Sequence, residues 1–337
     1  MNMQAIGRKI SILRKEHDLT QVELADKLGV TFQAVSSWER GNSMPDIAKL
    51  PDISQVLGVS IDDLLGSTKA ATVIKNVLTG QTTQTPDMEA VAEVAPILKP
   101  SQVENIITQS NSEVFDQNVE AIIDMADHLS SETLVRLLSV QLETGNLNSD
   151  FLVRVAHLLE SEDLRELALK CEFLNSNSIA EIACHMESED LREVALNCTF
   201  LEVRTIADIA SHMESEHLRD VAVNHTFMDD RTIIDIACHM ESEHLRDVAM
   251  SCKFIEDRTV VEIACHMESE DLREVVLNCK FLKPQNIASI ACHMESEDLK
   301  PVAARFIEEH GLPAFTKSGI LEHMEEEDIA EIMLSSL

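Results

Sequence analysis

The sequence contains no tyrosine, one tryptophan, nine glycines and eight prolines among its 337 residues. Sandwiches and barrels need many turn residues and strand-favouring aromatics, so this shortage argues against a strand-rich fold. No run approaches the roughly 18 uninterrupted apolar residues of a membrane-spanning helix. Residues 1–18 are amphipathic, but they carry acidic side chains and lack a cleavage-site pattern. We therefore expect neither a signal peptide nor a contact with a membrane.

Basic residues are also scarce, because 27 lysines and arginines stand against 60 aspartates and glutamates, for a formal net charge of −33. Most of such a surface would repel the phosphates of a nucleic acid. The charge is uneven, however: residues 1–66 hold 7 basic and 9 acidic residues, and residues 67–337 hold 20 and 51. Only the nearly neutral N-terminal part is expected to approach DNA without a large electrostatic penalty.

Sequence patterns typical of catalysis are missing as well. The chain has no G-x-S-x-G, glycine-rich phosphate loop, H-E-x-x-H or dinucleotide-binding fingerprint. We therefore expect no enzyme activity and no cofactor. Eight cysteines in a chain without an export signal indicate reduced thiols and a cytoplasmic location.

A 27-residue internal repeat dominates the C-terminal part. The string M-E-S-E-(D/H)-L begins at Met186, Met213, Met240, Met267 and Met294. A close variant begins at Leu159, and looser copies centre on Leu98, Leu129 and Met324. About nine units therefore lie between residue 88 and residue 337. A fixed period of this length predicts a stacked-repeat architecture.

Each unit has the pattern of two short helices. In one copy the apolar positions Ile206, Ile209, Ala210 and Met213 fall on one helical face. A second helix is expected to begin near Ser215 as its N-cap and to continue the apolar face through Leu218, Val221 and Ala222. A phenylalanine follows near the end of five units, at Phe173, Phe200, Phe227, Phe254 and Phe281. The layout resembles short HEAT-like two-helix repeats in architecture, and it predicts an all-α solenoid.

The N-terminal part carries a different signal in residues 20–41. Thr20 can cap one helix, Gly29 can adopt the positive φ of a tight turn, and Thr31 can cap a second helix. Helix, glycine turn and helix form the layout that places a second helix in the DNA major groove. We expect a five-helix domain over residues 1–66, a linker over residues 67–87 with a short helix at 72–78, and an acidic repeat domain over residues 88–337.

Several strings in residues 4–66 resemble the phage-repressor-like (Cro/XRE type) helix-turn-helix family. They are I-x-x-L-R from Ile10, L-T-Q-x-x-L-A from Leu19, V-S-x-W-E-R-G from Val35 and P-D-I-x-x-L from Pro45. The resemblance implies double-stranded DNA as the partner. It further implies an internal ion pair between Arg14 and Glu39.

The resemblance also implies which residues contact DNA. Gln21 would contact a phosphate, Phe32, Gln33 and Ser37 would face base edges, and the full set would be Gln21, Thr31, Phe32, Gln33, Ser36, Ser37, Arg40 and Asn42. Arg40 and Asn42 would touch the DNA backbone. Phe32 departs from the family pattern, because many relatives carry a polar residue there and a phenylalanine offers only apolar contact. One such domain makes few contacts, so we expect a homodimer on a palindromic operator.

Two columns of cysteine and one of histidine recur across the repeats. The first holds Cys184, Ser211, Cys238, Cys265 and Cys292, the second holds Cys171, Cys198, His225, Cys252 and Cys279, and the third runs from His128 to His323. Zinc-type C-x₂-C clusters are missing and successive units are about 10 Å apart, so we expect no metal site. The cysteines are expected to be small buried residues, and the histidines to be solvated or to cap a helix end.

The arginines at 165, 192, 219, 246 and 273 lie beside an acidic column, which predicts ion pairs between neighbouring units. The main hypothesis is a DNA-binding transcriptional regulator, acting as a dimeric repressor, whose repeats provide dimerisation or sense a peptide, protein or small-molecule signal. An alternative is a protein-interaction scaffold that the N-terminal domain tethers to DNA or to a partner. A third hypothesis is a metal or redox sensor that uses the cysteine columns.

Overall fold

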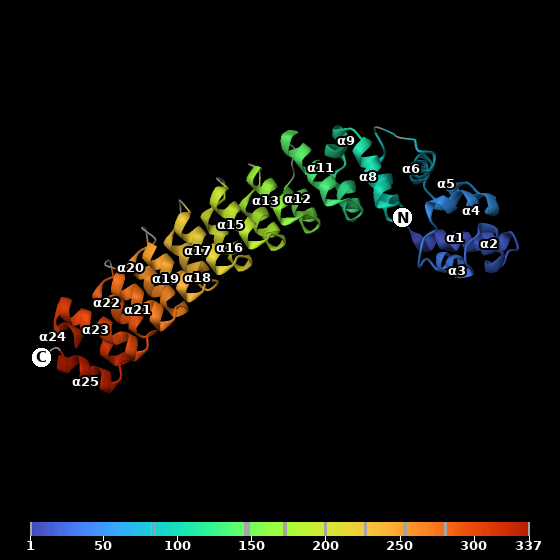
Figure 1. Ribbon diagram of the computed structural model, residues 1–337. Coiled ribbons are helices and arrows are strands. Elements are labelled where there is room, and N and C mark those ends of the chain that lie inside the picture. Colours follow the sequence, from blue (N-terminus) through green and yellow to red (C-terminus); the bar gives the residue numbers. More distant parts are fainter. Residues whose placement is uncertain are drawn as a thin grey trace. The chain divides into compact units, whose positions relative to one another are not determined.

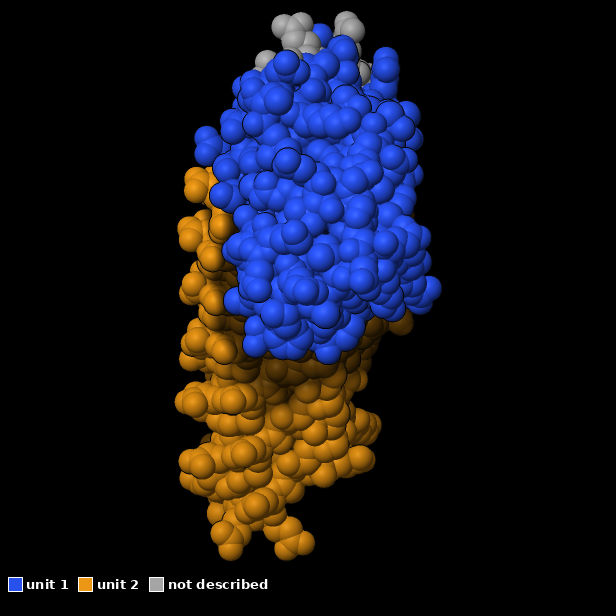
Figure 2. Space-filling model, turned by 90° about the vertical axis from the view of Figure 1, so that its right-hand side faces the viewer, with its two compact units in different colours: residues 1–159 blue, residues 160–337 orange. Residues whose placement is uncertain are grey.

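The computed structural model of the chain describes residues 2–81, 83, 85–144, 149–170, 174–198, 201–225, 228–251, 255–279 and 282–335. Every regular element in this part of the chain is a helix, and no strand occurs in it. None of these helices is both long and apolar enough to cross a bilayer. The chain divides into two compact units, Met1–Leu159 and Glu160–Leu337 (Figure 2).

The first unit begins with five helices around a small core. Their bounds are α1 (Met3–Glu16), α2 (Gln21–Leu28), α3 (Phe32–Glu39), α4 (Leu50–Leu57) and α5 (Ile61–Leu65), with a 3₁₀ turn at Ile47–Lys49. Helix α1 packs on α3, and α2 packs on both α3 and α4. Ile10, Leu24, Val35 and Ile53 are fully buried between them. This arrangement is the helix-turn-helix domain that the sequence motifs predicted.

Residue Gly7 lets α1 approach α3 closely. A Cβ atom at this position would lie 2.0 Å from the Trp38 carbonyl oxygen, which is far inside van der Waals contact. Only glycine therefore fits without moving the backbone at the end of α3. This role of Gly7 could not be predicted from the sequence, because a glycine in an otherwise regular helix gives no turn signal.

The segment expected to link the two parts of the chain contains a helix. Helix α6 (Thr68–Thr79) is longer than the short helix expected at residues 72–78, and it packs against α5 and α7. Ala70, Ala71 and Ile74 are fully buried in these contacts. The helix ends at Gly80, whose φ of 65° lies in the left-handed region. Polar residues follow it in the sequence.

The remainder of the first unit consists of looser repeats. It contains α7 (Met88–Val94), α8 (Pro100–Gln109), α9 (Ser112–Gln117), α10 (Val119–Met125), α11 (Ser131–Thr144) and α12 (Ser149–Val155). Short 3₁₀ turns follow α7, α10 and α12 and lead into the next helix. The predicted centres Leu98, Leu129 and Leu159 directly follow these turns.

The second unit stacks helix pairs in two rows (Figure 1). One row contains α13 (Ser161–Lys170), α15 (Ser188–Asn197), α17 (Ser215–Asn224), α19 (Ser242–Ser251), α21 (Ser269–Asn278) and α23 (Ser296–His310). The other row contains α14 (Ser176–Ile182), α16 (Val203–Ile209), α18 (Asp230–Ala237), α20 (Asp257–Ile263) and α22 (Pro284–Ala291). The unit ends with α24 (Leu312–Phe315), a 3₁₀ turn and α25 (Glu326–Ser335). The predicted α-solenoid is confirmed.

The apolar face predicted for each repeat is buried. Ile206, Ile209, Ala210 and Met213 are at most 7% exposed, and Leu218, Val221 and Ala222 are at most 2% exposed. Helices of seven to ten residues are unstable alone, so this burial against the neighbouring repeats is what holds them folded. The five phenylalanines expected near the unit ends, Phe173, Phe200, Phe227, Phe254 and Phe281, lie outside the described residues.

The expectation that Ser215 caps its own helix is wrong. The N-cap residue of α17 is Glu214, and Ser215 is the first residue of the helix. Its Oγ instead accepts a hydrogen bond from the backbone N–H of Glu241 in the next repeat, at 2.6 Å. The serine of the repeated motif therefore connects neighbouring repeats rather than starting a helix.

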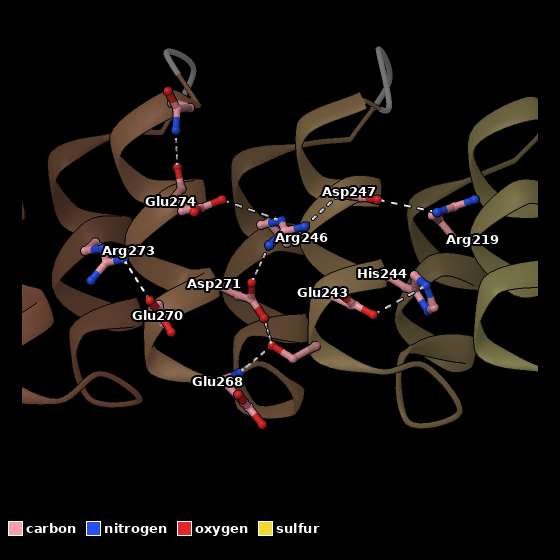
Figure 3. Close-up of polar contacts among 12 residues, drawn as sticks. Arg219, Glu243, His244, Arg246, Asp247, Glu268, Glu270, Asp271, Arg273 and Glu274 are labelled. Atoms are coloured by element: carbon pink, nitrogen blue, oxygen red, sulfur yellow. Dashed lines mark hydrogen bonds and ion pairs between the residues drawn. The ribbon is translucent and has the colours of Figure 1, made fainter.

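This connection recurs along the second unit. The serine Oγ of each unit accepts from the N–H of a glutamate in the next unit, at Glu187, Glu214, Glu241, Glu268, Glu295 and Glu325. The same hydroxyl also bonds a side chain of that next unit: an aspartate in four cases and a histidine in two. Asp271, for example, accepts from the Ser242 hydroxyl and also from Arg246. Figure 3 shows the contact between Asp271 and Arg246. These contacts explain why S and D/H recur in the motif.

The predicted ion pairs between neighbouring units are confirmed. Arg165, Arg192, Arg219 and Arg246 lie 3.3–3.6 Å from an acidic side chain 28 residues later in the chain. Arg246, for example, pairs with both Glu274 and Asp271 of the following repeat (Figure 3). These side chains are partly exposed, so each pair alone contributes little, about 0–1 kcal/mol.

Candidate nucleic-acid interface

Capping residues determine where α2 begins and ends and where α3 begins. The Thr20 side chain accepts from the Glu23 backbone N–H, and the Glu23 carboxylate accepts from the Thr20 N–H, which forms a capping box. Gly29 ends α2 in the left-handed region with a φ of 63°. Thr31 then accepts from the Ala34 N–H at 3.2 Å and starts α3. The predicted caps and the predicted glycine turn are all present.

Helix α3 has one buried face and one exposed face. Val35 and Trp38 face the core, with Trp38 only 7% exposed. Thr31, Phe32 and Gln33 are exposed, while Ser36 and Ser37 are half-buried. Phe32 is 45% exposed, which is unusual for a large aromatic side chain. The N-terminal turn of α3 thus presents an amide and an aromatic ring together.

A buried ion pair connects α1 with α3. Arg14 on α1 donates to both carboxylate oxygens of Glu39 on α3, and the Nη2–Oε2 distance is 2.9 Å. The two side chains are 9% and 5% exposed. Arg14 also donates to the Leu19 carbonyl oxygen at 2.6 Å, just before α2. The pair that the family resemblance implied is therefore formed, and it ties α1, α2 and α3 together.

This environment lowers the pKa of the Glu39 carboxyl. Burial, the largest single influence, raises the pKa of Glu39, but hydrogen bonds from Arg14, Gln21 and Ser11 together outweigh it and lower the pKa below its usual value. The hydrogen bond to Glu39 raises the pKa of Arg14. The pair is therefore charged at neutral pH and throughout the range above the ordinary carboxyl pKa.

Gln21, for which a phosphate contact was predicted, also bonds this ion pair. Its Nε2 donates to Glu39 Oε2 at 2.9 Å, so the carboxamide is held at the start of α2 and the side chain is half-buried. The second hydrogen of the held Nε2 and the adjacent N-terminal backbone N–H groups of α2 are suited to donate to a phosphate. That contact remains a prediction.

The residues after α3 complete the candidate surface. Arg40 and Asn42 are exposed, and Arg40 Nε donates to the Ser36 carbonyl oxygen at 3.1 Å. The Ser43 hydroxyl donates to Ser37 Oγ at 2.7 Å, which orients Ser37 from the loop. All eight predicted contact residues thus belong to the α2–α3 segment or to the loop directly after it. Ser43 was not predicted, because its role depends on the path of the loop after α3.

The cysteine columns divide into two environments. Cys198 and Cys279 are buried as expected, and burial raises the pKa of the Cys279 thiol. Cys184, Cys238, Cys265 and Cys292 are exposed instead, so the expectation of buried packing is wrong for this column. They lie in the turn that ends the first helix of each unit, where the apolar face is taken by the preceding alanine and the following methionine. Cys171 and Cys252 lie outside the described residues.

Six histidines of the third column are exposed, as predicted, at positions 185, 212, 239, 266, 293 and 323, whereas His128 is half-buried. Within the described ranges, one group of three residues has ligand atoms close enough for a shared ion, and it consists of Glu214, Glu216 and His217. It includes no member of the cysteine columns or of the exposed histidine column.

Comparison with known proteins gives matches for the N-terminal segment. The family model described as helix-turn-helix matches residues 10–64. The uncharacterised HTH-type transcriptional regulator YqaE of Bacillus subtilis is 48% identical over 52 residues, which are 15% of this chain and 45% of that relative. The regulator YazB of the same organism is 36% identical over 64 residues, which are 19% of this chain and 93% of YazB. The chain thus spans less than half the length of YqaE but nearly all of YazB.

Among solved structures, the apo form of the competence regulator ComR from Streptococcus vestibularis aligns over 100% of both chains. The sequence identity is 14% and the TM-score is 0.20. A TM-score this low does not indicate a common fold. The description of the repeats therefore depends on the helices and contacts given above.

Proposed function

Because this chain belongs to the helix-turn-helix family of transcriptional regulators, we propose that it binds a specific operator sequence through α3 and regulates transcription there. The observation that carries the proposal is the exposed N-terminal turn of α3, on which Phe32 and Gln33 project while Val35 and Trp38 anchor the opposite face. A glutamine can form two hydrogen bonds with adenine, and an aromatic ring can contact a thymine methyl group.

Four of the remaining contact residues are proposed to position α3 rather than to read the sequence. Gln21 and Thr31 lie at the starts of α2 and α3, where backbone N–H groups favour a phosphate. Arg40 and Asn42 are exposed in the loop after α3 and would touch the backbone. Ser36 and Ser37 lie on the partly exposed side of α3 and are proposed to bond base edges or sugar atoms.

We propose that the protein binds as a dimer to two half-sites about one helical turn apart. Selection of bound sequences from random DNA with the full chain tests both statements. The expected result is an enriched palindrome, whose two halves are separated by about 10 base pairs. Enrichment of a single half-site would contradict the dimer, and no enriched sequence at all would contradict specific recognition.

Repression is the proposed direction of regulation. Occupancy of an operator by a bulky chain is sufficient to block a promoter, whereas activation needs a further surface that contacts the polymerase. Expression of a reporter gene placed downstream of the selected operator is expected to fall when the protein is produced. A rise in output would contradict this direction.

The repeats are proposed to dimerise the protein or to bind a peptide or protein signal in the cytoplasm. Residues 67–337, which include the repeats, have a net charge of −31, and this favours a partner with a basic or mixed surface. In the alternative function, the repeats are a scaffold and the N-terminal domain is only a tether. Deletion of residues 160–337 distinguishes the two, because a regulator loses dimerisation or signal response, whereas a scaffold loses a bound protein without change in reporter output.

A further inference from the structure

A cavity of about 310 Å³ lies between α6 and α8 in the first unit, well away from α3 in the sequence. This volume is at the lower end of the range for small-molecule sites, which is about 300–1,000 Å³. Apolar side chains of both helices and of α7 line part of it, at Val73, Val77, Val91 and Ile106. The turn after α6 supplies Gly80, Thr83 and Pro86.

Carboxamides make up most of the polar lining, beside the hydroxyl of Thr83. Five carboxamide side chains line the cavity, at Asn76, Gln81, Gln102, Asn105 and Gln109. No acidic or basic side chain is among the described residues that line it, although the chain as a whole carries 87 such residues, 60 acidic and 27 basic. Gln81, Asn105 and Gln109 are exposed, so the cavity is open to solvent on that side. An ion bound there would lose part of its water and gain no opposite charge from the described lining, which is unfavourable.

Most of these carboxamides have free hydrogen-bonding capacity. Gln102 Oε1 accepts from the Lys99 N–H at 2.9 Å, which leaves its amide hydrogens unused, and Asn76 makes one long bond of 3.4 Å to Thr83. The side chains of Gln81, Asn105 and Gln109 have no hydrogen bond to any described residue. Each carboxamide offers both donors and acceptors, so the matching ligand carries both as well.

We propose that this cavity binds a small, uncharged molecule that contains amide groups and an apolar substituent. Amides pair with carboxamides through one donor and one acceptor each, and the apolar substituent would cover Val77 and Ile106. The site goes beyond the proposed operator binding, because it uses no residue of α2 or α3. The ligand would contact α6, which packs against α5 of the helix-turn-helix domain, and α8 of the first repeats.

A matched series of leucine derivatives tests the ligand class on the full chain. N-acetyl-leucine methylamide is uncharged and has two amides. N-acetyl-leucine has a carboxylate in place of one amide, and free leucine is a zwitterion without an amide. Binding is measured by saturation-transfer NMR, which detects weak complexes. We expect saturation of the methylamide and at least tenfold weaker binding of both charged forms. No saturation of the methylamide, or equal binding of all three, would overturn the proposal.

Variants assign the binding to this cavity. Asn105→Leu removes one carboxamide and is expected to weaken binding about tenfold, the effect of one or two lost hydrogen bonds. Ile106→Trp fills the cavity and is expected to abolish binding. The control is Thr108→Leu, an exposed position on the same helix that does not line the cavity. If Asn105→Leu binds the methylamide as the unaltered chain does, the assignment is wrong. Operator binding by these variants is measured separately, so failure of either proposal is recognised independently.

Discussion

At the residue scale, the candidate interface depends on side chains with different tasks. Phe32 and Gln33 are exposed and free to contact a base pair, whereas Arg14 and Glu39 are buried and hold α1, α2 and α3 in place. Gln21 belongs to both groups, because its carboxamide donates to Glu39 from the start of α2. Substitutions in the two groups are therefore expected to differ in what they change.

Replacement of Gln33 by alanine should affect sequence discrimination more than folding. Loss of a bidentate contact to adenine lowers the preference for the selected base by about 1–3 kcal/mol. Competition binding with operators altered at one base pair measures this preference. Gln55→Ala on α4, which is equally exposed, is the matched control. Unchanged preference in the Gln33 variant would mean that α3 lies differently in the groove.

Replacement of Glu39 by glutamine should destabilise the N-terminal domain by about 3 kcal/mol at neutral pH, because Arg14 would stay buried without a counter-charge. The chain has one tryptophan, Trp38, and it is buried in this domain, so its fluorescence reports the unfolding of the domain.

The same pair predicts a pH dependence. The pKa of Glu39 is lowered in the folded chain, so its contribution to stability is complete above the unfolded carboxyl pKa and disappears as the pH falls through the folded value. The difference between the unaltered chain and Glu39→Gln should therefore shrink in acid. A difference that stays constant down to the acid limit of folding would contradict the role of this pair.

At the scale of the element, the helices were predicted from the sequence more successfully than the contacts between repeats. Periodic apolar positions such as Ile206 and Ile209 identified helices, because burial of one face follows directly from spacing. Ser215 was misassigned, because a serine before an acidic residue has the same local pattern whether it caps its own helix or bonds the next repeat. The exposed cysteines were misjudged for a related reason, since a column shows recurrence but not the face on which it lies.

The candidate interface was more predictable than the rest, because caps, a glycine turn and the Arg14–Glu39 pair are local or motif-defined features. The cavity between α6 and α8 was not predictable, because it depends on how a helix in an expected linker packs against the first repeat. Its carboxamides are separated by up to 33 positions in the chain, from Asn76 to Gln109. No spacing pattern brings such residues together before the packing is known.

The serine contacts predict a specific loss of stability. Ser242→Ala should destabilise the repeats by about 1–3 kcal/mol, because the Glu268 N–H loses its acceptor and Asp271 loses a donor. The circular dichroism transition is expected to shift to lower denaturant, while the Trp38 fluorescence transition stays in place. Ser211→Ala, at an exposed serine in the cysteine column, is the control. Equal effects of the two variants would argue against a special role for the contacts between repeats.

At the scale of the whole molecule, DNA contact and the remaining functions are assigned to different parts of the chain. The first 66 residues have a net charge of −2 and contain α3, while the other 271 residues have a net charge of −31. Phosphates are repelled by the second part, so its surface is free for dimerisation or for a protein signal.

Photo-crosslinking of the full chain to its selected operator, followed by mapping of the joined peptides, tests this division most directly. The account predicts crosslinks within residues 20–42, lost or moved when Gln33 and Arg40 are replaced. Crosslinks concentrated in residues 160–337 would contradict it.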